Sequence, residues 1–139
     1  MSGEQVVGRY LEIMNALDMD ALAGLLTDDV VVRLPFAPDP VPKETVGKVG
    51  VLALYGGFPS LVSPLGFHDA DIRPLAADGE FVAEYRSDCT MLATGLPYRN
   101  SYVSLFTVRG DRLASIAEFF DPLVFLAAQG VALSIPTGI

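Results

Sequence analysis

Apolar residues follow a helical period in the first part of the chain and a period of two after Pro64. Between Glu4 and Ala16 they recur every three or four positions, which predicts an amphipathic helix. A short second helix is predicted from Ala21, and Thr27 to Asp29 end it. The β-branched segment from Val30 to Leu34 is typical of a strand. This part of the chain therefore predicts two helices followed by a strand.

A proline-rich segment follows this strand. Prolines cannot lie inside a helix or a central strand, so Phe36 to Lys43 is predicted to be a loop. A third helix is predicted over Val46 to Tyr55, although Gly47 and Gly50 weaken the helical pattern.

The C-terminal half alternates apolar and polar residues, and short turns divide it into four predicted strands. Because the turns are short, neighbouring strands are expected to be antiparallel. Asp121 and Pro122 are suited to the start of a last helix over Leu123 to Gln129, which Gly130 closes. Helices first and a meander of strands afterwards predict an α+β fold. The predicted strands are Phe67 to Leu75, Phe81 to Thr94, Tyr98 to Val108 and Leu113 to Phe120.

Composition supports one domain over residues 1–139, because 51% of the residues are hydrophobic and a chain of this length can bury a sizeable core. The formal net charge is -8, with only nine Lys and Arg residues. Phosphate binding requires clustered basic residues, so no nucleic-acid partner is expected.

Two long uncharged stretches, residues 49–67 and 122–139, raise the question of a membrane role. Glycines and prolines interrupt both, and neither gives about 20 continuous apolar helical residues, so no membrane partner is expected. We expect both stretches to lie against a large apolar cavity or against a second copy of the chain in a homodimer. The N-terminus does not resemble a signal peptide and Cys89 is the only cysteine, which favours a cytoplasmic protein.

The hairpin that ends at Phe120 carries the candidate chemistry. Alternation places Glu118 in an apolar row between Ile116 and Phe120. An ionised carboxylate buried without partners costs several kcal/mol, so Glu118 must be protonated, hydrogen-bonded by groups such as Asn100 and Tyr102, or directed into a cavity. We therefore expect Glu118 to be the catalytic residue, with a pKa raised by desolvation. The expected ligand-binding residues are Tyr10, Asn100, Tyr102, Ser104 and Phe120.

Structural interpretations compete with these roles. Glu118 could be ionised and satisfied by Arg112, Asn100 or water. Asn100 and Tyr102 could bond to helix ends or to the Tyr98 loop, and Tyr10 could be an ordinary core residue.

Four other features have simpler structural interpretations. Asp121 is interpreted first as a helix cap. Successive strand residues point to opposite faces, so His68 and Asp69 are expected to diverge, and no metal site is expected. Cys89 is expected in the core. The charged row predicts a solvated face or a ladder of charges across a subunit boundary; its members are Glu84, Arg86 and Asp88.

The chain resembles the nuclear transport factor 2-like superfamily, and within it the SnoaL-like branch. The resemblance spans nearly the whole chain. It implies an α+β cone in which a curved antiparallel sheet wraps around about three helices and encloses an apolar pocket. It also implies a homodimer, because many proteins of this family are homodimers. The resemblance rests on Val6-Val7-Gly8-Arg9-Tyr10, Asn15-Ala16-Leu17-Asp18-Met19-Asp20-Ala21-Leu22, Leu26-Thr27-Asp28-Asp29-Val30 and the hairpin from Tyr102 to Pro122.

Two enzymes of this superfamily suggest roles for individual positions. Compared with ketosteroid isomerase, Tyr10 falls at the oxyanion-donating tyrosine, Leu34 at the catalytic base, and Ser104 at the protonated aspartic acid. The C-terminal part is similar to phenazine-biosynthesis A/B-type proteins, which place an acid/base glutamate at Glu118. Their histidine and serine partners would fall between Val49 and Phe58, where this chain has neither residue type.

Three functions are compatible with this pattern. The first is cofactor-independent proton transfer, as an isomerase or cyclase, on an apolar cyclic or polyketide-like substrate. The second is a binding or carrier domain that holds an apolar metabolite without turning it over. The third is hydration or epoxide opening like that of limonene epoxide hydrolases, whose Asp-Arg-Asp relay would have to come from Arg33, Arg99, Asp88 and Asp121.

Overall fold

The computed structural model describes residues 1–138, and its first element is helix α1 (Gly3–Ala16). Ser2 starts the helix with a capping box, because its hydroxyl accepts from the Gln5 backbone N–H and its own N–H donates to the Gln5 side chain. The buried face consists of Val6, Val7, Tyr10, Leu11, Ile13 and Met14. The helical period thus predicted this element to within one residue.

Of the next five elements, two were not predicted and the other three differ from the predictions at their ends. Helix α2 (Met19–Leu25) leads directly into strand β1 (Leu26–Arg33), which begins four residues before the predicted strand. The pairing of β1 is irregular between Leu26 and Val31, and this irregularity disrupts the alternation. A short strand β2 (Glu44–Val46) precedes α3 (Lys48–Tyr55) and α4 (Phe58–Leu61). The third helix therefore begins two residues later than predicted and ends at Tyr55 as predicted.

The main sheet has six strands in the order β2-β1-β8-β7-β4-β3. The antiparallel prediction for consecutive strands is confirmed for the pairs β3–β4, β4–β7 and β7–β8. Strand β1 pairs antiparallel with β2 and parallel with β8. The remaining strands of the main sheet are β3 (His68–Pro74), β4 (Glu80–Arg86), β7 (Ser101–Arg109) and β8 (Arg112–Phe120).

Two of the predicted strands are each divided in two. The strand predicted over Phe81 to Thr94 divides at Ser87, and the strand predicted over Tyr98 to Val108 divides at Asn100. The two short pieces, β5 (Cys89–Thr90) and β6 (Pro97–Tyr98), form a small antiparallel sheet of their own. At the bend, the Asn100 N–H donates to the Ser87 hydroxyl at 3.0 Å while the Ser87 N–H donates to the Asn100 carbonyl. Burial alternates through the bend, which explains why the sequence pattern looks like one continuous strand.

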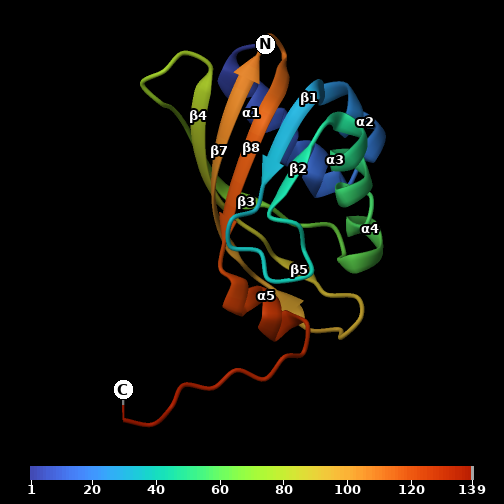
Figure 1. Cartoon of the computed structure of the whole chain (residues 1–139), viewed down its shortest axis with the longest axis vertical. Helices are drawn as coiled ribbons and strands as arrows, with labels where there is room; N and C mark the ends of the chain where they lie inside the picture. Colours follow the sequence, from blue (N-terminus) through green and yellow to red (C-terminus); the bar gives the residue numbers. More distant parts are fainter. Residues whose placement is uncertain (139) are drawn as a thin grey trace.

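The helices α1 to α3 pack on one side of the main sheet (Figure 1). Helix α1 contacts β3, β4, β7 and β8, and α3 contacts β1 and β2. The aromatic ring of Tyr10 meets that of Phe106 edge-on, with 5.5 Å between centroids. The core therefore lies between these helices and the sheet face that carries Tyr102, Ser104 and Phe106.

The last helix, α5 (Pro122–Ala128), lies at the end of the molecule beyond β8, and the chain then extends away from the body (Figure 1). Asp121 caps it as predicted: its carboxylate accepts from the backbone N–H groups of Leu123 and Val124. Ile139, the last residue of the second uncharged stretch, lies outside the described residues. Within residues 1–138, no helix is long and apolar enough to cross a membrane.

Candidate active site

A cavity of about 390 Å³ lies between the helices and the sheet. Its wall is made by helices α1, α3, α4 and α5, by the loop around Val41, and by strands β6 to β8. Apart from one carboxyl and four phenol groups, the lining side chains are apolar. Of the six predicted site residues, four line the cavity: Tyr10, Tyr102, Glu118 and Phe120.

Glu118 is held by a tyrosine that the sequence did not identify. The Tyr85 hydroxyl, from β4, donates to the Glu118 carboxylate at 3.0 Å. Asn100 and Tyr102, the expected partners, bond elsewhere. The pairing of β7 with β8 sets Ser104 opposite Glu118, and the pairing of β4 with β7 brings Tyr85 alongside.

Ser104 contacts the site through Tyr85. Its hydroxyl lies 2.8 Å from the Tyr85 hydroxyl. Since the Tyr85 proton is used toward Glu118, Ser104 is the donor in this pair. Ser104 is fully buried and is not among the residues that line the cavity. The result is a chain of two hydrogen bonds that ends on the carboxylate.

The environment of Glu118 shifts its acidity toward neutral pH. Burial raises the pKa of the Glu118 carboxyl from 4.5 to about 7, while the hydrogen bond from Tyr85 lowers it. Near neutral pH the site therefore contains comparable amounts of carboxylic acid and carboxylate. A group in this state can both accept and donate a proton.

A second polar group in the cavity is a pair of tyrosines from two helices. The hydroxyls of Tyr10 (α1) and Tyr55 (α3) lie 3.1 Å apart, and both side chains are buried. Burial, the largest cause, raises the pKa of both phenols, and the negative charge of Glu118 adds to the rise. Both phenols therefore stay protonated near neutral pH and provide two O–H protons for one mutual hydrogen bond.

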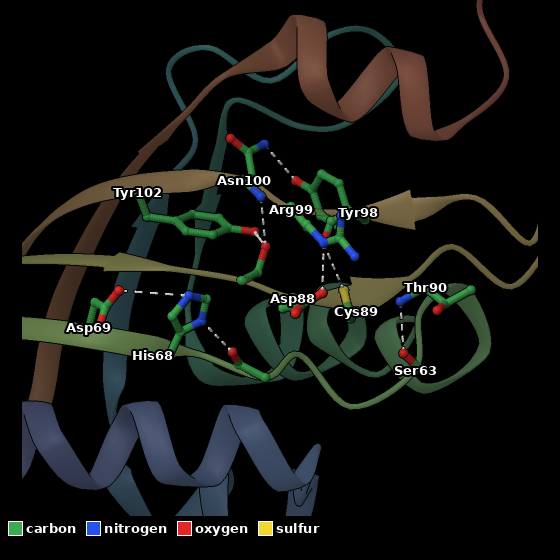
Figure 2. Close-up of polar contacts among 12 residues, drawn as sticks. Ser63, His68, Asp69, Asp88, Cys89, Thr90, Tyr98, Arg99, Asn100 and Tyr102 are labelled. Carbon is green, nitrogen blue, oxygen red and sulfur yellow. Dashed lines mark hydrogen bonds and ion pairs between the residues drawn. The ribbon is translucent and has the colours of Figure 1, made fainter.

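The rest of the cavity wall is aromatic and fixed by packing. Tyr102 stacks on Tyr85 with ring centroids 5.0 Å apart, and its hydroxyl donates to Ser87. Figure 2 labels Tyr102, the donor of this hydrogen bond. Phe67 packs edge-on against both rings, and the Asn15 side chain holds the Phe67 backbone through its N–H and its carbonyl. These contacts keep the aromatic rings in fixed positions.

Asn100 has the structural role that was left open as its alternative. Its amide donates to the Tyr98 hydroxyl and to the Asp121 carbonyl, and it accepts from the Asp121 N–H (Figure 2 shows the bond to Tyr98). Asn100 is buried but is not among the residues that line the cavity. It joins the start of β7 to the end of β8 and the first residue before α5.

Two predictions about charged side chains have different outcomes. The row of Glu84, Arg86 and Asp88 is exposed as predicted. The divergence of His68 from Asp69 is wrong, because β3 pairs irregularly there and Asp69 has a φ of 54°, so the His68 ring approaches the Asp69 carboxylate to 3.8 Å (Figure 2). Both residues are exposed and lie outside the cavity wall.

Most of the chain is similar to known proteins. Residues 7–116 match the model of a family described as SnoaL-like domain. An uncharacterised protein of Bacillus subtilis strain 168, YesE, is 27% identical over 126 residues, which cover 91% of this chain and 86% of YesE. The structure of a proposed isomerase from Bacillus subtilis is 27% identical with a TM-score of 0.86, and 93% of each chain is covered.

Two structures with lower identity share the fold. A proposed polyketide cyclase from Pseudomonas putida KT2440 is 19% identical with a TM-score of 0.80, and the match covers 95% of this chain and 99% of that protein. An NTF2-like protein from Burkholderia xenovorans LB400 is also 19% identical, with a TM-score of 0.73 and coverage of 91% and 94%. These likenesses confirm the predicted α+β fold of the nuclear transport factor 2-like type.

Proposed function

The chain belongs to the SnoaL-like domain family, and on this premise we propose that it is a small-molecule enzyme for proton transfer. The substrate is an apolar cyclic or polyketide-like compound, and the reaction is an isomerisation or cyclisation that needs no cofactor. One observation carries the proposal: a carboxyl group with a pKa of about 7, Glu118, lines an otherwise apolar cavity of about 390 Å³.

In this proposal Glu118 takes a proton from a carbon next to a substrate carbonyl and returns it at another position. The electron pair left on the substrate moves onto the carbonyl oxygen, which becomes negatively charged. Tyr10 and Tyr55 use one of their two O–H protons in their mutual hydrogen bond, so the other is available to donate to that oxygen. The apolar wall strengthens this hydrogen bond by excluding water.

The test is hydrogen–deuterium exchange on bicyclic ketones such as 2-tetralone, followed by mass spectrometry in deuterated buffer at pH 7.5. We expect the protein to accelerate exchange next to the carbonyl by at least about 100-fold over buffer, and Glu118→Gln to lose about two orders of magnitude of this acceleration. The matched control is Glu84→Gln, which changes an exposed carboxylate of the same sheet. Full exchange activity in Glu118→Gln would exclude Glu118 as the acid/base.

A second candidate is a binding or carrier domain for an apolar metabolite. It is favoured by the scarcity of proton-transfer groups, because Glu118 is the only carboxyl group among the described lining residues. Leu34, which falls at the position of the catalytic base in ketosteroid isomerase, contributes only apolar surface. A metabolite that copurifies and is recovered unchanged, without deuterium uptake, would support this candidate.

Epoxide opening has less support from the side-chain arrangement. The relay would need arginine and aspartate at the cavity, but Arg33 pairs with Glu44 and Arg99 pairs with Asp88, all of them exposed. Figure 2 shows the Arg99–Asp88 pair.

We also propose that the chain forms a homodimer in the cytoplasm. Support for the dimer comes from the sheet face opposite the helices, where Val103 and Leu105 of β7 are exposed. The location is inferred from the single cysteine, Cys89, which is buried and unpaired.

A further inference from the structure

The charge on the cavity lining is of one sign. Glu118 is the one charged side chain among the described lining residues, and no lysine, arginine or histidine is among them. The arginines closest in sequence to the lining strands, Arg33 and Arg99, are exposed and already paired with carboxylates. A carboxylate or phosphate ligand would therefore lose its hydration in an apolar space whose described lining offers no cation to compensate its charge.

The wall is rich in aromatic rings. An ammonium ion is attracted to the negative face of such a ring, and more strongly where water is excluded. Several rings hold one another in place, such as the stacked pair Tyr55 and Phe58 at 5.2 Å and the edge-on pair Tyr98 and Phe125 at 5.9 Å. The aromatic lining residues are Tyr10, Tyr55, Phe58, Phe67, Tyr98, Tyr102, Phe120 and Phe125.

Every other titratable group that faces Glu118 is a phenol. Burial raises the pKa of each of them above that of a free phenol, to about 12 for Tyr98. They are therefore uncharged at neutral pH, and the charge of the cavity is set by Glu118 alone. These phenols are Tyr10 from α1, Tyr55 from α3, Tyr85 from β4, Tyr98 from β6 and Tyr102 from β7.

We propose that the cavity binds lipophilic amines in their protonated form, with the ammonium group on the Glu118 carboxylate, and that it rejects carboxylates of the same shape. The carboxylate supplies a charged hydrogen-bond acceptor and the rings supply a surface that a cation prefers over an anion. This inference rests on the proposed function only in using Glu118 as the polar group of the same cavity. Such amines compete with any neutral substrate for the site.

The test compares three ligands with one carbon skeleton by isothermal titration calorimetry: 2-naphthylmethylamine, 2-naphthylmethanol and 2-naphthoate. At pH 8 we expect the amine to bind at least about tenfold more tightly than the alcohol, and the carboxylate to bind more weakly than both. Between pH 8 and pH 6 amine affinity should fall about tenfold, because Glu118, with a pKa of about 7, becomes protonated. Alcohol affinity should change less than about twofold over this range.

Two variants make the origin of the preference explicit. Glu118→Gln keeps the shape of the side chain, so we expect it to lose the preference for the amine and to keep alcohol binding. Tyr85→Phe removes the hydrogen bond that lowers the pKa of Glu118, so the loss of amine affinity should begin at a higher pH than in the parent protein. Circular dichroism checks that both variants are folded, and the pH profile of the parent protein tests the inference without either.

The inference is overturned if amine and alcohol bind equally at pH 8, if the carboxylate binds as tightly as the amine, or if the amine preference persists in folded Glu118→Gln. Its failure is distinct from failure of the proposed function. Ketone exchange without amine selectivity would overturn the ligand class and leave proton transfer standing. Amine selectivity without exchange on any ketone would support the ligand class and favour a binding domain over an enzyme.

Discussion

Glu118 is held in the cavity at a cost to stability that depends on pH. Its pKa is about 7 in the folded protein and close to 4.5 in the unfolded chain, so between these values the folded state holds a proton that the unfolded state has released. Stability contributed by this group is therefore complete below pH 4.5, falls as pH rises toward 7, and stays low above it. The ionised carboxylate opposes folding at pH 8.

Glu118→Gln should remove this penalty. We expect the free energy of unfolding of the variant, relative to the parent protein, to be about 2 kcal/mol higher at pH 8 than the same difference at pH 5. Urea denaturation at the two pH values measures it. The comparison of differences cancels the titration of exposed groups, and Glu84→Gln, on the exposed side of β4, is the matched control. A difference that is equal at both pH values would mean that Glu118 titrates normally.

The tyrosine pair across the helices should be coupled. Tyr10→Phe and Tyr55→Phe each leave a buried hydroxyl without its partner, whereas the double variant removes both groups. We expect each single variant to lose about 1 to 2 kcal/mol of stability and the double variant to lose less than their sum. Thermal or urea unfolding of the four proteins gives the coupling energy. Additive losses would show that the 3.1 Å contact does not contribute to stability.

Alternation along single strands predicted much of the site, because it depends only on local geometry. It correctly put Tyr102 and Ser104 on one face of β7 and Glu118 and Phe120 on the matching face of β8. It did not identify Tyr85 as the partner of Glu118, since that contact spans β4, β7 and β8 and depends on the register of two strand pairs. Tyr55 was missed for a similar reason: its role follows from the packing of α3 on α2 and β1.

At the scale of elements, strand length was the least predictable property. The period-two pattern continues through Ser87 and Asn100, yet β4 ends just before Ser87 and β7 begins just after Asn100. Each has a polar side chain that bonds to nearby backbone groups, and such local bonds compete with the regular strand pairing. Burial alternates on both sides of the bend, so hydrophobicity alone contained no signal for it.

Helix α5 offers an element whose start the sequence predicted in full. Asp121→Ala removes the acceptor for the N–H groups of Leu123 and Val124, and we expect a loss of about 1 kcal/mol in unfolding free energy. Asp121→Asn should retain most of the stability because an amide oxygen can cap equally well. Since Phe125 of α5 lines the cavity, the alanine variant should also bind 2-naphthylmethanol more weakly. Equal stability of the alanine and asparagine variants would contradict the capping role.

At the scale of the whole molecule, the order of strands could be anticipated only for consecutive ones. The hairpins β3–β4 and β7–β8 follow from short turns. The parallel pairing of β1 with β8 joins segments that are more than 80 residues apart, and no local pattern in either strand indicates it. That pairing extends the sheet beside the cavity and brings Leu34, just beyond β1, into the cavity wall.

In the proposed dimer, the two copies meet through the outer face of the sheet. Val103 and Leu105 keep 43% and 41% of their surface exposed, and Phe119 of β8 lies opposite Val103 and packs edge-on against the exposed ring of Phe36. An apolar strip of this kind on the exposed face of a sheet is a surface that association would bury. Placing a charge at its centre, as in Leu105→Arg, would bury an unpaired guanidinium in the dimer.

We therefore expect Leu105→Arg to raise the dimer dissociation constant by at least about tenfold, as measured by sedimentation velocity across micromolar concentrations. The matched control is Leu92→Arg, which adds the same charge at another exposed leucine, outside the main sheet and between β5 and β6. Because Leu105 points away from the cavity, the monomeric variant should still bind 2-naphthylmethanol. A parent protein that sediments as a monomer would refute the dimer, and a variant as dimeric as the parent would move the interface away from this face.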